Sequence, residues 1–333
     1  MSTLNVLADM LIIDVSLVFL AGVSPLARRD AVEWTKLMRA LGVNRIEEAV
    51  PGEEGRLGAR GSAVPGEEGR LGVRGSAVPG EDGRLGARGS GVYAAYSASA
   101  ASLDELFRAR AAGELPGDIR LHGLDDALLH WDMPIFFSRL RSAFPDIEPA
   151  FGNSWGCATA LGVEWLRQGG RNLVCSFAGI GGLAPLEEVV MALCLSGFRP
   201  RGETSVLAGL RGLFERLGGE TTANNKAVIG PGVFAVESGI HVDGLAKEPT
   251  LYEPFPPESV GARRVIVMGP HSGRGSVRLK CAQLGLRCDH ETLSELLDET
   301  RSLGRFLERS LADDEFVSLH RRIYEKRGRA SAG

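Results

Sequence analysis

The sequence lacks the charge imbalance that marks several large classes of binding protein. Its 333 residues carry 38 Lys and Arg against 42 Asp and Glu, for a net charge of −4. A chain without a basic excess has no electrostatic footprint for nucleic acid or for an anionic membrane. Hydrophobic residues make up 44%, which excludes a wholly disordered chain.

The chain also lacks a cysteine framework. It has five cysteines, an odd number, and none of them form a CxxC pair. Scattered, unpaired thiols are typical of a reducing compartment, so we expect a cytoplasmic protein.

Long hydrophobic runs are missing as well. The most apolar stretch, residues 11–22, is interrupted by Asp14, and no basic residue precedes Arg28. A spanning helix needs about 20 apolar residues, and a signal peptide needs a positive start. We therefore expect a buried strand here and no membrane segment.

Glycine is abundant instead, and much of it lies in a tandem repeat. Residues 49–90 hold three near-identical 14-residue copies, the first reading AVPGEEGRLGARGS. Each copy has too few sizeable apolar residues to offset the entropy of ordering the chain. We expect a flexible surface loop, with a binding array as the alternative.

Outside the repeat, short apolar strands alternate with amphipathic helices, which favours a parallel α/β fold. We expect strands at residues 10–15, 43–47, 92–96, 119–121 and 173–177, and helices at 25–41, 102–112, 135–144, 158–167 and 186–195. From about residue 200 helices dominate, at 204–217, 275–285, 291–311 and 313–326. The pattern predicts a first domain at 1–198 and a second, smaller one at 199–333.

Polar residues gather between residues 224 and 274. Glu237 precedes His241 by four positions with glycines on both sides, followed by Tyr252 and the run from His271 to Arg274. A carboxylate and a histidine so placed are typical of an acid/base or ligand loop. HxD alone is a weak pattern; the order of the whole segment is more specific.

That segment, from ESGIHVDGLAKEP to SVRLKCAQLGL, closely resembles homocitrate synthases of the nitrogen-fixation type, within the isopropylmalate/homocitrate synthase family. The resemblance extends upstream through LEEVVMAL at 186–193 and downstream to about Tyr324. It implies a TIM barrel followed by a helical C-terminal subdomain, usually in a dimer. It also implies condensation of acetyl-CoA with a 2-oxo acid, 2-oxoglutarate for homocitrate, held on a divalent metal.

By the same resemblance, His241 matches a subdomain histidine that reaches a neighbouring active site, and Tyr252 matches the tyrosine that accompanies it. Glu237, His271 and Arg274 become candidate substrate contacts. The alternative is that His271 and Arg274 only tie the subdomain together.

The barrel half departs from the family at three motifs. Where the family has D-T-T-L-R-D-G-E-Q, Val18 replaces the arginine and Phe19 the metal aspartate. Where it has H-x-H-N-D, Ala150 and Gly152 replace both histidine ligands. Where it has G-x-G-E-R-x-G-N, residues 179–185 carry no Glu, Arg or Asn. A divalent ion of this type needs oxygen and nitrogen ligands, so we expect no metal cofactor in this chain.

Other residues of this half have structural interpretations. We expect Asp14 to cap the end of its strand, Trp155 and Trp165 to fill the core, and Cys157 to pack rather than react. The resemblance also implies that about two βα units are missing between Gly113 and Gly117, so we expect an incomplete barrel, since eight strands close a TIM barrel.

Three hypotheses follow. The chain is a homocitrate synthase-like acyltransferase serving nitrogenase cofactor assembly; or an inactive paralogue that pairs with a complete synthase, as a homodimer or heterodimer; or a small-molecule sensor. The missing metal ligands favour the second over the first.

Overall fold

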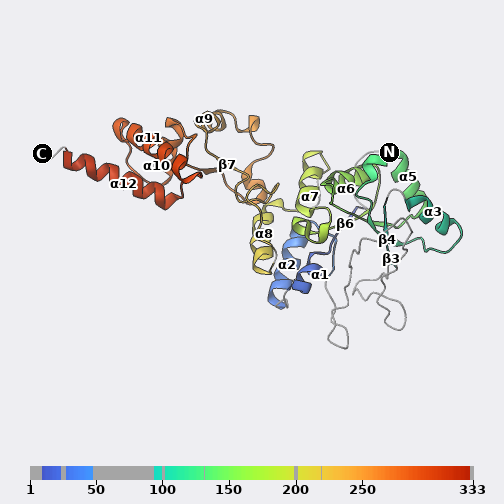
Figure 1. The fold of residues 1–333 in the computed structure, drawn as a ribbon. Coiled ribbons are helices and arrows are strands. Elements are labelled where there is room, and N and C mark those ends of the chain that lie inside the picture. Colours follow the sequence, from blue (N-terminus) through green and yellow to red (C-terminus); the bar gives the residue numbers. More distant parts are fainter. Residues whose placement is uncertain are drawn as a thin grey trace. The chain divides into compact units, whose positions relative to one another are not determined.

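The computed structural model describes residues 10–23, 28–47, 94–99, 102–130, 132–198, 202–218 and 220–330. The tandem repeat at 49–90 lies outside these residues. The chain divides into two units, residues 1–222 and 223–333, and each is described by itself (Figure 1).

The first unit is an alternation of strands and helices, as the sequence predicts. Its strands are β1 (Leu11–Asp14), β2 (Arg45–Ile46), β3 (Ala94–Ala98), β4 (Ile119–Gly123), β5 (Glu148–Phe151) and β6 (Asn172–Cys175). Its helices are α1 (Ser16–Val23), α2 (Arg28–Ala40), α3 (Leu103–Ala111), α4 (Ala127–His130), α5 (Met133–Ala143), α6 (Ala158–Arg167), α7 (Leu186–Leu195) and α8 (Leu207–Arg216), with short 3₁₀ turns η3 (Phe177–Gly182) and η4 (Thr204–Val206).

The six strands form two parallel sheets of three, in the orders β2-β1-β6 and β3-β4-β5. In the first sheet Ile13 pairs with Arg45 on one side and with Val174 on the other. In the second, His122 pairs with Ala150. Strands β5 and β6 lie side by side, and Asn172 of β6 donates a hydrogen bond of 3.2 Å to the Ile147 carbonyl just before β5. The strand pairs within both sheets are parallel, so the predicted α/β class is confirmed.

Helix α8 belongs to the first unit, because its apolar face packs against α2. The Phe214 ring lies 6.5 Å from the Trp34 ring and 5.5 Å from the Phe177 ring, centroid to centroid. The sequence pattern assigned this helix to a domain beginning at 199, whereas the two units divide after Thr222. The strand–helix alternation therefore ends near Pro200, but the packing of the first unit continues through α8.

The second unit is mainly helical. It contains β7 (Ala235–Val236), α9 (Gly239–Lys247), η5 (Pro249–Leu251), η6 (Pro257–Val260), β8 (Val265–Ile266), α10 (Arg274–Gln283), α11 (His290–Leu307) and α12 (Asp313–Ala330). Helices α10, α11 and α12 enclose one apolar core, whose most buried members include Val277, Leu296 and Phe316. A deeply buried lysine, Lys280, pairs with Asp313 at 2.5 Å and ties α10 to the start of α12.

Two expectations fail on particular residues. Trp165 is buried at 1% exposure, as predicted, but Trp155 is 63% exposed, because it lies in the loop after β5 rather than on a core-facing helix. The expected ligand loop around His241 is a helix, α9, because Val242 and Leu245 are buried three residues apart on one face. No helix within the described ranges is long and apolar enough to cross a bilayer.

Candidate functional site

The three motifs that depart from the family meet at the carboxyl ends of β1, β5 and β6. Gly152, just after β5, forms a bridge with Leu183, just after η3. The Asn153 amide donates to the Gly182 carbonyl at 2.8 Å. The Phe19 ring, in α1, lies against Gly181, where any added Cβ would overlap it. The sequence thus brings together the segments that the family resemblance singles out.

These segments enclose an apolar cluster, which we call the strand-end cluster. Its buried members are Ile13, Val15, Ala150, Val174 and Leu183, and Val18 and Phe19 pack against it. Cluster side chains at the aligned metal and arginine positions offer no oxygen or nitrogen to a divalent cation, so the residues present do not fit such an ion. Within the described ranges, no group of three or more His, Cys, Asp or Glu side chains is placed to hold a metal.

Asp14 is the carboxylate nearest to this cluster in sequence, but it faces the opposite side of β1. It accepts hydrogen bonds from the Ser16 amide at 3.0 Å and from Trp34 Nε1 at 2.8 Å, and also from the Ser16 hydroxyl. The Ser16 hydroxyl in turn accepts one from the Phe177 amide at 2.7 Å. Complete burial raises the pKa of Asp14, against the effect of these hydrogen bonds. Asp14 thus joins β1 to α2 and η3 and performs a structural task.

A layer of charged side chains lies one step earlier along the strands, and we call it the ionic layer. Arg120 of β4 contacts Glu47 at 2.8 Å and Glu148 of β5 at 2.5 Å, and Arg45 of β2 contacts Glu148 at 2.5 Å. Since β2 belongs to one sheet and β4 and β5 to the other, these pairs connect the inner faces of the two sheets. The layer contains two arginines and two glutamates, so its formal net charge is zero.

The ionic layer shifts the protonation of its members. Burial alone would raise the pKa of Glu47, but hydrogen bonds and the charges of Arg120 and Arg45 outweigh it, so the pKa is lowered. For Arg120, burial alone would lower the pKa, and the bonds to Glu47 and Glu148 raise it. Glu47, Arg120 and Arg45, whose pKa is also raised by its contacts with Glu148 and Glu47, are therefore charged at neutral pH. Sequence reasoning missed this layer, because nothing in the local pattern of β2, β4 or β5 indicates which distant strands will face each other.

His122 lies on β4, one step beyond the ionic layer and level with Ala150 of the strand-end cluster. It is two residues after Arg120 on the same face of the strand, and it is the pairing partner of Ala150 in β5. Burial first, and the Arg120 charge second, lower the pKa of His122 to about 4. The ring is therefore neutral at physiological pH. Its position beside the strand-end cluster was also missed by the sequence reasoning.

The five site residues proposed from the sequence all belong to the second unit, and the structure brings four of them together as two pairs. Glu237 Oε1 accepts a hydrogen bond of 2.7 Å from the His271 amide. Ser276 Oγ donates to the Glu237 carbonyl at 3.1 Å. The Glu237 carboxylate thus fixes the backbone that leads into α10. Arg274 is the exposed first residue of that helix.

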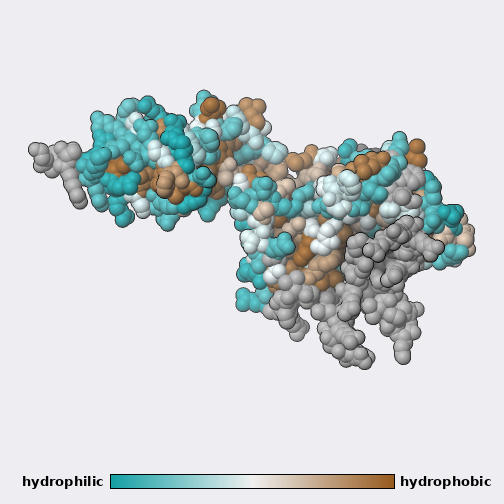
Figure 2. Space-filling model, viewed as in Figure 1, coloured by the Kyte–Doolittle hydropathy of each residue, from teal (hydrophilic) through white to brown (hydrophobic). Residues whose placement is uncertain are grey.

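His241 and Tyr252 form the second pair. Their rings lie 5.4 Å apart at 68°, an edge-on contact between α9 and the residue after η5. Gly244 makes the contact possible, because a Cβ there would overlap the tyrosine ring. Both side chains are exposed, and the neighbouring Ile240 and Leu251 are 79% and 76% exposed. Figure 2 shows brown, apolar surface over α9.

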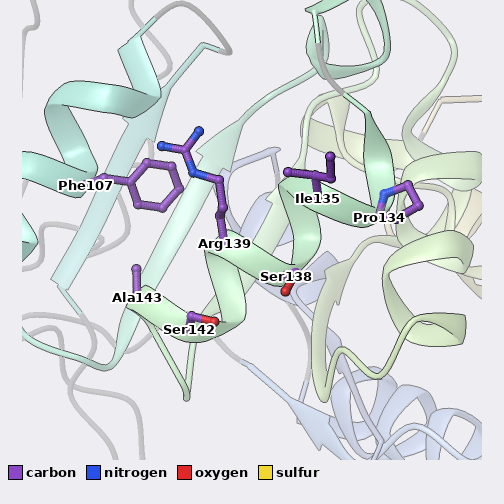
Figure 3. Close-up of a pocket in the computed structure, with 7 residues that line it drawn as sticks. All are labelled: Phe107, Pro134, Ile135, Ser138, Arg139, Ser142 and Ala143. Atoms are coloured by element: carbon purple, nitrogen blue, oxygen red, sulfur yellow. The ribbon is translucent and has the colours of Figure 1, made fainter.

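A separate groove of about 710 Å³ lies on the outside of the first unit, between α3 and α5. Figure 3 shows the Arg139 guanidinium next to the Phe107 ring, and the guanidinium carbon lies 4.6 Å from the ring centroid. Arg139 also pairs with Asp104 at 2.9 Å. Because helix side chains line this groove and strand ends do not, it is distinct from the strand-end cluster.

Residues 228–306 match the family described as homocitrate synthase post-HMGL domain-like. The chain is 34% identical over 248 residues to homocitrate synthase AksA of Methanopyrus kandleri, covering 72% of this chain and 62% of that protein.

Two further relatives match about half of the chain. Identity is 30% over 170 residues to the homocitrate synthase omega subunit of Clostridium pasteurianum, covering 51% of this chain and 48% of that protein. It is 37% over 171 residues to homocitrate synthase 1 of a Nostoc species, covering 50% and 45%. The chain thus spans less than two thirds of the length of each of these relatives.

Parallel strands alternating with helices, followed by a separate and mainly helical unit, define a two-unit chain of the α/β class. The chain belongs to the homocitrate synthase family, with 2-isopropylmalate synthases among its relatives.

Proposed function

We propose that this chain is a partner subunit of an acyl-CoA-condensing synthase of the homocitrate branch, and that it does not carry out the condensation by itself. The observation that carries the proposal is the strand-end cluster. Apolar side chains fill the place where the family resemblance puts a metal and an arginine. A 2-oxo acid bound there would meet no cation and no fixed donor for its developing negative charge, so the chemical step would lack its main stabilisation.

The proposed partner role rests on residues of the second unit. His241 and Tyr252 are in contact, exposed, and next to the apolar side chains of Ile240 and Leu251. An imidazole at the surface can act in an active site only if that site belongs to another chain or closes over it. We propose that this surface meets a complete synthase subunit and that His241 serves there as a proton donor or acceptor, with Tyr252 holding the ring.

The relatives support an assembly of this kind. One of them is named as the omega subunit of a homocitrate synthase, a name that implies a further subunit in that protein. By analogy the substrates of the assembly are acetyl-CoA and 2-oxoglutarate, in the cytoplasm, and the product would serve nitrogenase cofactor assembly.

A first unit that has lost part of the family barrel would depend on a partner subunit. Strand β3 pairs directly with β4, and only residues 112–118 connect α3 to β4. That link is too short for a strand and a helix, which is why we propose that about two βα units of the family barrel are missing.

Co-expression with a complete homocitrate synthase tests the proposal. The complete subunit carries an alanine at its own matching histidine, and CoA release is measured with acetyl-CoA and 2-oxoglutarate. We expect the chain alone to release no CoA and the mixed assembly to recover activity. His241→Ala in this chain should reduce the recovered activity by about 10²-fold or more, whereas His290→Ala, an exposed histidine on α11, should not. CoA release by the chain alone would show a complete enzyme instead, and failure to form a mixed assembly would refute the partner role.

A further inference from the structure

The chain reverses sharply after α10, and this reversal brings two cysteines together. The Leu286 amide donates to the Cys281 carbonyl at 2.8 Å, and the Gly285 amide donates to the Ala282 carbonyl at 3.2 Å. Gly285 has a φ of +66°. Paired bonds of this kind with a left-handed glycine form a Schellman ending, which folds the chain back over the last turn of the helix.

The residues that follow are held in place on both sides of Cys288. The buried His320 of α12 donates from Nε2 to the Arg287 carbonyl at 2.6 Å. Asp289 caps α11 by accepting from the Thr292 amide at 2.7 Å. Cys288 is thus anchored between two fixed neighbours and packs on the same apolar core that contains Cys281.

The two thiols meet in this core. Cys288 packs against the core cluster that contains Cys281, and the neighbouring Cys288 thiol contributes to the pKa shift of Cys281. Cys281 is 1% exposed, whereas Cys288 is only partly buried. Burial, and then the contact with Cys288, raise the pKa of Cys281 to about 12, so Cys281 stays a thiol at neutral pH. Solvent can reach Cys288 more easily, so an oxidant meets that thiol first.

We propose that Cys281 and Cys288 form a dithiol modification site, which a peroxide converts into a disulfide within one chain. The Cys288 thiolate attacks one peroxide oxygen, breaks the O–O bond and becomes a sulfenic acid, releasing hydroxide. The Cys281 sulfur then attacks the Cys288 sulfur, the S–S bond forms, and water leaves with the Cys281 proton. In total, two thiols lose two electrons and two protons, and one hydrogen peroxide becomes two waters. This site is independent of the proposed synthase partnership.

The remaining cysteines differ from this pair. Cys157, Cys175 and Cys194 belong to the first unit. Cys175 is completely buried in β6, so an oxidant reaches it less easily than the partly buried Cys288. Oxidation should therefore be selective for the pair in the second unit.

Peptide mapping of the full-length chain tests the site. The reduced protein is treated with hydrogen peroxide, blocked with iodoacetamide under denaturing conditions, and digested with trypsin. Cleavage after Lys280, Arg287 and Arg301 separates the two cysteines into peptides 281–287 and 288–301. We expect these peptides joined by a disulfide, a fall in alkylated thiols from five to three, and reversal by dithiothreitol.

Variants make the result decisive. Cys288→Ser should abolish the cross-link, and Cys281→Ala should abolish it by an independent change. Cys194→Ser, the matched control, should leave it intact. Oxidation of Cys288 only to a sulfinic acid, a cross-link between other cysteines or between chains, or five alkylated thiols after peroxide treatment would each overturn the proposal.

Discussion

Adding one methyl group at Gly181 should disrupt the strand-end cluster through Phe19. Gly181 has a φ of +76°, and a Cβ there would overlap the tip of the Phe19 ring. Gly182 is the matched control, because its φ is +73° but nothing lies within 4 Å of its Cβ position. Alanine at either position carries the strain of a left-handed backbone, about 1–2 kcal/mol. Gly181→Ala should cost about 1–3 kcal/mol more, the usual penalty for overpacking.

Urea unfolding followed by tryptophan fluorescence measures this difference. All four tryptophans (Trp34, Trp131, Trp155 and Trp165) precede residue 223, so the fluorescence reports on the first unit. In a Phe19→Ala background, the extra cost of Gly181→Ala over Gly182→Ala should disappear. Equal costs for the two glycine variants, or an extra cost that persists without the Phe19 ring, would refute the packing of Phe19 on Gly181.

Three further predictions concern the same unit. Arg120→Met should lower the free energy of unfolding by about 3–5 kcal/mol, because Glu47 and Glu148 lose their shared cation. Arg108→Met, in an exposed pair, should change it by less than about 1 kcal/mol. A similar effect of both variants in urea unfolding would contradict the ionic layer. The pKa of His122 is lowered to about 4 from 6.5 in the folded chain, so the unfolded chain binds the proton first as the pH falls. The free energy of unfolding should therefore decrease as pH drops from 6.5 towards 4, by at most about 3 kcal/mol. His122→Gln should flatten this dependence between pH 5 and 6.5, and an unchanged slope would refute the lowered pKa of His122. Deleting residues 49–76, two repeat copies, should change stability by no more than about 1 kcal/mol, and a melting temperature lower by several degrees would show that the repeat packs.

The sequence predicts regular helices better than the features that bring the site together. Helices α6 and α7 begin and end where their apolar spacing indicates, and β1 coincides with its short apolar run. Helix α9 was missed, because it is nine residues long and contains glycines at 239 and 244. Strand β5 was missed as well, because it begins with Glu148 and Pro149, residues that disfavour strands, and only the ionic layer explains a buried glutamate there.

The contacts that build the candidate site were also not predictable from the sequence. Family motifs indicated which positions had lost their polar residues, but not that Phe19 would lie on Gly181 or that Leu183 would join the same cluster. Phe19 and Gly181 are more than 100 positions apart in the chain, and Leu183 reaches the cluster across a bridge to Gly152. Local patterns carry no information about such pairs. The prediction that Trp155 is buried was wrong for a related reason. An aromatic residue in a loop is buried only if the loop packs against the core.

Calorimetric titration with Mn²⁺ at pH 7.5 tests the central claim most directly, namely that apolar side chains have replaced the metal site at the strand ends. The account predicts no stoichiometric binding in the micromolar range, both for the unmodified chain and for Asp125→Ala, which removes the carboxylate beside Gly152. One-to-one micromolar binding that is lost in Asp125→Ala would contradict it.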